Sequence, residues 1–212
     1  SLSNYTISTY NGTDSSALAA ALVGKHVLLF PEQESGSSGH YLNFAPVISR
    51  FMAAGGRVVV CASANTASRL SALGLFSGTL ISTVSSGTLD RVNATHFVTQ
   101  NIPAAFSAPD ATTYYDFTDP SRIPLVTIGS AYDVVTYKAF GSGEAIYLGF
   151  DYWSTSTPVT QLLANCIGGG SISMESWIIM DELIDTVAVG DSLSFPVVIS
   201  SVDQLAGSDT SI

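Results

Sequence analysis

Positive charge is scarce in this sequence of 212 residues. Lysine and arginine together number 7 against 17 aspartates and glutamates, and the formal net charge is −10. A nucleic-acid-binding protein needs a basic surface that releases counterions from phosphates, and anionic membranes also attract basic surfaces. We therefore expect neither a nucleic-acid partner nor a membrane partner. Hydrophobic residues make up 46% of the chain, which excludes a disordered protein.

Several signals of cofactor, metal and membrane binding are also missing. No apolar run reaches the roughly 18 residues that a transmembrane helix needs. The glycine-rich motifs that bind phosphates or dinucleotides do not occur, nor does the H-E-x-x-H motif, so we predict no cofactor and no metal site. Cysteine occurs only at Cys61 and Cys166, both in apolar segments. The two could form one disulfide, and we favour two separate buried thiols.

The first third of the chain predicts alternating helices and strands. A strand is expected at residues 5–10, and continuous apolar runs at 26–30 and 57–61 are typical of buried parallel strands. Helical spacing occurs at 15–23, 41–54 and 65–73, and each of these segments is followed by glycine. The alternation predicts an α/β fold, a flavodoxin-like doubly wound sheet that is mostly parallel.

The later part of the chain predicts shorter strands that follow one another closely. They lie at 79–84, 95–99, 113–117, 125–128, 134–140 and 145–150. The turn at 141–143 favours an antiparallel hairpin for the last two, and Pro158 favours a helix to about residue 167. Gly168–Gly170 marks a boundary. We predict an α/β domain over residues 1–168 and a partial β segment over 171–212, since a complete sandwich takes about 100 residues.

Two stretches resemble the class I glutamine amidotransferase-like superfamily, its ThuA-like branch in particular. They are HVLLFPEQES with FMAAGGRVVVCASANTASRLSALGLF, and YKAFGSGEAIYLGFDYWS with the helix VTQLLANCI. In that superfamily the strand after a Gly-Gly ends at the nucleophile, and Cys61 falls at that position. A third stretch, SWIIMDELIDTVAVGDSLSFPVVI, looks like the opening strands of a bacterial immunoglobulin-like module.

Cys61, Glu32 and His96 form the candidate catalytic set. Cys61 ends a buried strand ahead of a helix, where open α/β sheets place their sites and where a thiol pKa can be lowered. The resemblance to the intracellular-protease-like (PfpI-like) branch implies that Glu32 contacts the cysteine. The family also carries a late catalytic histidine, whereas Asp151 stands near that position and no histidine follows His96. The alternative is that Cys61 is a buried structural residue, Glu32 a solvated acid and His96 not catalytic.

Glu34, Asp151, Tyr152 and Trp153 form the candidate ligand-binding set. Glu34 follows the first buried strand, and the other three follow the last strand of the hairpin, so we expect all four at the carboxyl edge of the sheet. An acid flanked by two aromatics is suited to a sugar, because rings stack on apolar sugar faces and acids bind hydroxyls. A packed corner is the alternative.

Three functions remain open at this point. The preferred one is a non-catalytic extracellular binding or scaffolding module of a larger secreted bacterial protein, in contact with a carbohydrate or a protein partner. The second is a cysteine-dependent hydrolase that uses Cys61. The third is an assembly protein that forms an oligomer through exposed strands. A chain poor in lysine and rich in serine and threonine favours an extracellular or cell-surface location. No secretory signal opens the chain.

Overall fold

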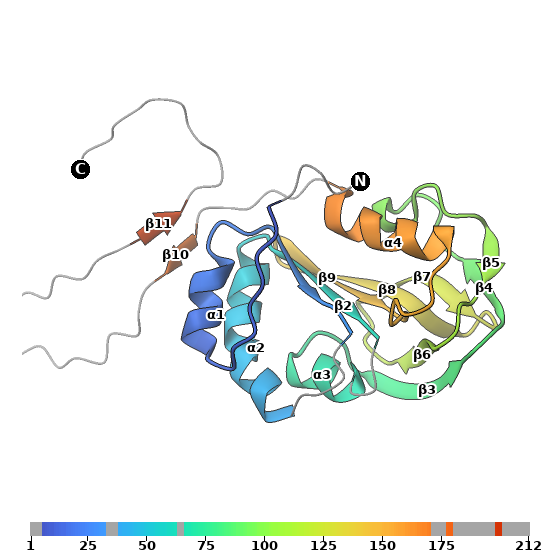
Figure 1. The fold of residues 1–212 in the computed structure, drawn as a ribbon, viewed down its shortest axis with the longest axis horizontal. Helices are drawn as coiled ribbons and strands as arrows, with labels where there is room; N and C mark the ends of the chain where they lie inside the picture. Colours follow the sequence, from blue (N-terminus) through green and yellow to red (C-terminus); the bar gives the residue numbers. More distant parts are fainter. Residues whose placement is uncertain (1–5, 33–37, 63–65, 171–176, 180–197, 201–212) are drawn as a thin grey trace, which may run out of the picture.

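A nine-stranded mixed sheet forms the centre of the fold (Figure 1). The structure is a computed structural model, and it describes residues 6–32, 38–62, 66–170, 177–179 and 198–200. The main path of the sheet runs β1-β2-β9-β8-β7-β4-β5, and β6 branches from β8 to pair with β3. The α/β class predicted from the sequence is confirmed.

Three parallel strands make up one side of the sheet. They are β1 (Val27–Phe30), β2 (Arg57–Cys61) and β9 (Gly143–Leu148), with β2 in the middle. The helices α1 (Ser15–Leu22), α2 (Ser38–Ala53) and α3 (Thr66–Ala72) lie within one or two residues of the predicted ones at most of their ends. Asp14 caps α1 by accepting a hydrogen bond of 2.7 Å from the Ala17 N–H. The apolar runs and the glycine stops therefore located this half correctly.

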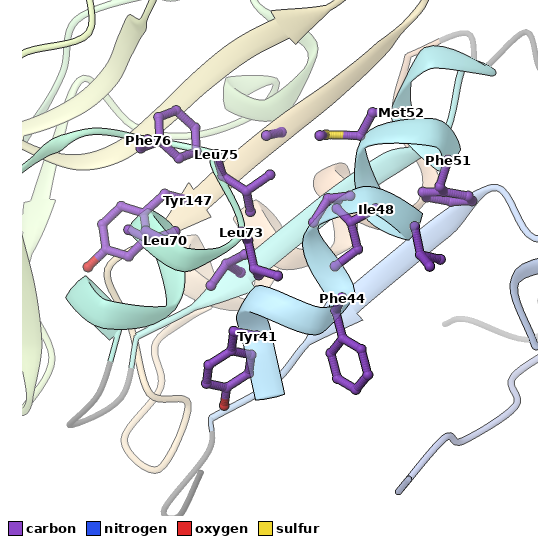
Figure 2. Packing of buried hydrophobic residues seen from close by; sticks show 14 of the residues in the cluster. Tyr41, Phe44, Ile48, Phe51, Met52, Leu70, Leu73, Leu75, Phe76 and Tyr147 are labelled. Carbon is purple, nitrogen blue, oxygen red and sulfur yellow. The ribbon is translucent and has the colours of Figure 1, made fainter. Parts of the chain in front are cut away.

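Helices cover both faces of these parallel strands. Because side chains alternate along a strand, Val58 and Val60 of β2 pack under α1, α2 and α3, in a cluster that includes Ile48 and Leu70. Figure 2 shows this cluster between α2 and α3. Val59 and Cys61 point to the other face and pack with Val159, Leu162 and Cys166 of α4 (Thr157–Gly168).

The remaining strands pair in the antiparallel direction. They are β3 (Gly78–Val84), β4 (Thr88–Arg91), β5 (Ala105–Ser107), β6 (Thr112–Phe117), β7 (Ile123–Ile128) and β8 (Tyr132–Phe140). A parallel crossover needs about a dozen residues, and connections as short as 129–131 allow only a hairpin. The predicted mostly parallel arrangement therefore holds for β1, β2 and β9 alone. The sheet as a whole is mixed.

The predicted hairpin near residue 142 is confirmed. β8 and β9 are antiparallel, with Phe140 opposite Gly143. Gly141 has φ of +60°, which favours glycine. A Cβ on Gly143 would lie 2.2 Å from the Met52 carbonyl oxygen, so this position brings the hairpin directly against the end of α2.

Two predicted strands are wrong. Residues 6–10, the described part of the strand predicted at 5–10, form no strand and pair with none of the strands of the sheet. The segment predicted as a strand at 95–99 contains instead the 3₁₀ helix η1 (Phe97–Thr99). His96 caps this helix, since its Nδ1 accepts a hydrogen bond of 3.3 Å from the Val98 N–H.

The tail contributes two short strands, β10 (Trp177–Ile179) and β11 (Val198–Ser200), which pair in the antiparallel direction. The rest of the predicted immunoglobulin-like segment lies outside the described residues, so that resemblance stays a prediction. Within the part of the chain that the structure describes, no helix has the length and apolar character to cross a membrane.

Candidate functional site

The carboxyl edge of β1, β2 and β9 brings several of the predicted site residues to one side of the sheet. Glu32 follows β1, Cys61 ends β2, and Asp151 follows β9. The ends of β2 and β9 are joined there, since the Ala62 N–H donates to the Leu148 and Phe150 carbonyls at 2.9 and 3.0 Å. Glu34 lies outside the described residues.

Cys61 lies at this edge but is buried and not accessible to solvent. It is 2% exposed and packs in the hydrophobic cluster beneath α4. Burial raises the pKa of the Cys61 thiol from 9.0 to about 12, an effect that nearby Arg69 opposes and Glu32 reinforces. Since the thiolate is the nucleophile, a thiol held in its neutral form is unsuited to covalent catalysis at neutral pH.

Arg69 of α3 closes the same edge, and the sequence reasoning missed it. The residue is 1% exposed, and its Nη2 donates to the Cys61 carbonyl at 2.9 Å and its Nη1 to the Pro31 carbonyl at 3.4 Å. Its guanidinium also lies 5.9 Å from the centre of the Tyr41 ring. Burial lowers the pKa of Arg69. The signal was available: Arg69 stands beside Leu70, which belongs to the buried side of a short helix.

His96 lies at the opposite end of β2. Its ring packs on Phe97 and Tyr137, with centroids 4.7 and 4.5 Å away. The pKa of His96 is lowered overall, mainly by burial. Nearby Arg57 adds to this decrease, and nearby Glu144 opposes it. Arg57 and Glu144 begin strands β2 and β9, and the five residues of β2 span about 13 Å. The structure therefore does not bring His96 to Cys61.

Arg57 organises the amino end of β2, and it too was missed. It is 1% exposed and forms an ion pair with Glu144. Its Nη1 donates to the Cys166 carbonyl at 2.7 Å and to the Gly169 carbonyl at 2.8 Å, so it binds the last turn of α4. The Phe97 ring lies 4.5 Å below its guanidinium. A charged residue at the start of a fully buried strand was the sequence signal for such an anchor.

The turn after β9 separates its two aromatic side chains. Asp151 closes the turn, because its Oδ1 accepts a hydrogen bond of 2.9 Å from the Trp153 N–H. Tyr152 turns inward: its ring packs edge-on to Phe150, and its hydroxyl donates to the Val159 carbonyl at 3.4 Å. Burial raises the pKa of Tyr152 well above its ordinary value. Trp153 turns outward and is 90% exposed.

A shallow polar hollow of about 570 Å³ lies over the start of α4. Its lining consists of hydroxyl and amide side chains with one alanine: Thr155, Ser156, Thr157, Thr160, Gln161 and Ala164. Ser156 is the N-cap residue of α4 but makes no capping hydrogen bond through its side chain. Only Ser154 separates Trp153 from Thr155, so the two Cα atoms are at most about 7 Å apart. Thr160, Gln161 and Ala164 lie in the helix that Pro158 predicted, but the hollow itself was not predicted from the sequence.

Comparison with known proteins places the fold. The chain matches no protein-family model and no curated protein sequence. Among solved structures it is similar to a ThuA-like protein from Bacteroides uniformis, at 16% identity and a TM-score of 0.51, over 73% of each chain. It is also similar to two cytoplasmic proteins from Salmonella typhimurium. One has 11% identity and a TM-score of 0.55 over 70% of this chain and 73% of the other. The second has 10% identity and a TM-score of 0.53 over 70% and 72%.

These similarities concern the fold alone. The predicted ThuA-like architecture is supported, and identities of 10 to 16% carry no information on activity.

Proposed function

We propose that this protein is a non-catalytic binding module whose ligand is a neutral carbohydrate. The observation that carries the proposal is Trp153, a large aromatic residue that is 90% exposed beside a polar hollow. An indole ring has an apolar face and a polar N–H, and it stacks well on the C–H face of a sugar ring.

The turn that presents Trp153 supports this assignment. Tyr152 has φ of +65°, a left-handed conformation that is unfavourable for a bulky side chain. The packing of Tyr152 on Phe150 and the Asp151 hydrogen bond keep the turn in this shape. Because the backbone of the turn is already held in this shape, ordering it costs little free energy when a ligand binds, which favours affinity.

The hollow supplies the polar half of a sugar site. Sugars carry several hydroxyls that both donate and accept hydrogen bonds, and the lining offers threonine hydroxyls and the Gln161 amide. In the first turn of α4, Pro158 has no N–H and the Thr160 N–H donates to the Ser156 carbonyl at 2.9 Å, so the polar contacts of the hollow come from side chains.

The charge of the chain selects among sugars. With a net charge of −10, an acidic polysaccharide meets repulsion, and the hollow has no basic residue in its lining. Neutral hexose polymers therefore fit the site better than uronic-acid or sulfated polymers.

The enclosure of Cys61 supports the non-catalytic part of the proposal. A thiol that is 2% exposed, with a pKa raised to about 12, does not provide the accessible thiolate that a cysteine hydrolase requires. No feature of the described residues favours the hydrolase over the binding module.

The proposal is tested by affinity electrophoresis against a panel of soluble neutral and acidic polysaccharides, followed by calorimetry on those that retard the protein. We expect binding to a neutral polymer. Trp153→Ala should weaken it by about 2 kcal/mol, roughly thirtyfold in Kd, as for the loss of an aromatic anchor. Its thermal unfolding should be unchanged, since the side chain is 90% exposed.

Tyr132→Ala is the control, because Tyr132 is also an exposed aromatic residue, at 37%, and lies in β8 outside the lining of the hollow. It should leave sugar affinity unchanged. Failure of the wild-type chain to bind any polymer, or equal binding by Trp153→Ala, would refute the carbohydrate assignment.

The proposed ligand goes with a location outside the cell, as the composition predicts. The Salmonella neighbours are cytoplasmic proteins, but at 10 and 11% identity their compartment does not transfer to this chain. Detection of the protein in the culture medium of its native host would support the location, and its confinement to cell lysate would overturn it.

A further inference from the structure

Strand β3 is an exposed edge of the sheet. Among the described strands it pairs only with β6, and it forms a rim of the molecule in Figure 1. Five of its seven residues are exposed and the other two are half-buried. An edge strand presents a row of backbone N–H and C=O groups on its outer side, which is a template for one more strand.

The other edges of the sheet offer less. β1 has four residues, all half-buried, and β5 has three residues. β3 is therefore the longest and most accessible of these edges.

β3 also lacks most of the devices that keep edge strands apart. Its sequence, GTLISTV, contains no lysine, no other charge and no proline, and it is rich in residues that favour strands. Leu80 and Ile81 are 42% and 40% exposed. A further strand would lie next to both of these apolar side chains, although the regular alternation of faces is interrupted at Ile81, where the register with β6 shifts. One irregularity is present, a bulge at Ile81 opposite β6.

The electrostatics of the chain select the partner. Two copies with a charge of −10 each repel one another, so self-association requires a surface where no carboxylates meet. The sequence has no charged residue from Leu70 to Leu89. On the neighbouring strand β6 the one carboxylate is Asp116, opposite Thr79 near the beginning of β3. The middle of β3 is thus neutral.

We propose that β3 pairs with β3 of a second copy of this chain, antiparallel and across a two-fold axis near Ile81. Identical antiparallel strands are self-complementary, since each residue i opposite j is matched by j opposite i. The pairing joins the two sheets at their β3 edges. It is independent of the Trp153 surface, so either proposal can fail alone.

The test is sedimentation velocity of the full chain over a wide concentration series, in low and high salt. We expect the mass to double as concentration rises, and the dimer fraction to increase with salt because the repulsion between the copies is screened. A monomer at every concentration would overturn the proposal.

Ile81→Lys places a charge at the centre of the pairing and should abolish the dimer. Ile123→Lys is the matched control: it is the same substitution at the same exposed fraction, 40%, on β7. It should leave the dimer intact. A dimer that survives Ile81→Lys, or one that both variants abolish, would refute pairing through β3.

Amide hydrogen exchange of the wild-type chain provides a readout that needs no variant. Dimerisation should slow exchange in residues 78–84 at high concentration relative to low concentration. Protection that rises elsewhere but not in β3 would assign the interface to another surface and overturn the proposal.

Discussion

A buried arginine lies at each end of strand β2, Arg57 within the strand and Arg69 on helix α3, and the two bind different parts of the fold. Arg57, at the amino end, donates to the Cys166 and Gly169 carbonyls and so binds a helix to the sheet. Arg69, at the carboxyl end, donates to the Pro31 and Cys61 carbonyls and so joins the ends of two neighbouring strands.

The difference explains where the edge of the sheet is available for a ligand. Open α/β sheets bind ligands at the carboxyl ends of their strands. Here Arg69 binds the carbonyls at the carboxyl ends of β1 and β2. The Cys61 side chain is buried against α4. Among the described residues of this edge, the exposed groups other than Pro31 lie after β9, at Trp153 and the start of α4. One edge is therefore divided into a closed part and an open part.

The largest expected effect tests whether the carboxyl end of β2 is closed. In a Cys166→Ala background, the pKa shift of Cys61 from 9.0 to about 12 lowers its thiolate fraction by three powers of ten. A thiol-directed reagent at neutral pH should therefore label the native chain at least about a thousandfold more slowly than the unfolded chain.

Ser71→Cys, on the exposed side of α3, supplies the native reference for that measurement and should react as rapidly as the unfolded chain. Rapid labelling of native Cys61 would show that the carboxyl end of β2 is accessible and would favour the hydrolase hypothesis.

The next largest effect tests the amino end. Arg57→Met removes the ion pair with Glu144 and leaves the last carbonyls of α4 without their donor. Loss of one partner of a buried pair costs about 3 kcal/mol or more. We expect the lower end of that range, because the Glu144 side chain keeps 16% exposure. Urea unfolding measures the change.

Arg50→Ala is the control for arginine loss, since Arg50 is exposed in the last turn of α2. It should change the free energy of unfolding by less than about 0.5 kcal/mol. Equal effects of Arg57→Met and Arg50→Ala would remove the anchoring role from Arg57.

The smallest expected effect is a pH dependence at the amino end. Burial and Arg57 hold the pKa of His96 below 6.5, against the effect of Glu144. The unfolded chain then takes up the proton first, so the contribution of His96 to stability is fully present well above pH 6.5 and is lost progressively as the pH falls below that value. The free energy of unfolding, measured between about pH 7.5 and 5.5, should fall more steeply with decreasing pH in the wild type than in His96→Gln. Parallel curves would contradict this.

The sequence predicts the parallel half of the fold well for a local reason. Each strand and helix there has its own signal, such as the apolar run at 57–61 or the Asp14 cap. Whether the later strands pair in the parallel or the antiparallel direction depends instead on which other strand each one pairs with in the folded sheet. Short connections such as 129–131 allow only hairpins, whereas the alternation of strands and helices in the first third predicts a parallel sheet for that third alone.

The site was harder to predict because burial is a property of distant residues. Cys61 stands at the predicted edge, but its side chain is covered by Val159 and Leu162, about a hundred positions later in the sequence. His96 depends on Tyr137 in the same way. Asp151, Tyr152 and Trp153 lie after β9 as predicted, because a turn is local, but the inward direction of Tyr152 depends on its packing on Phe150 and could not be predicted. Their role in ligand binding stays a prediction.

The Arg57 anchor has a mechanical consequence. Gly169 and Gly170 stand where the chain leaves α4, and Arg57 binds the Gly169 carbonyl from the central parallel strand. A pull on the chain just after Gly170 would therefore load the arginine, and through it the interior of the sheet, before α4 could peel away. The exit of the chain is thus tethered to a fully buried central strand of the sheet.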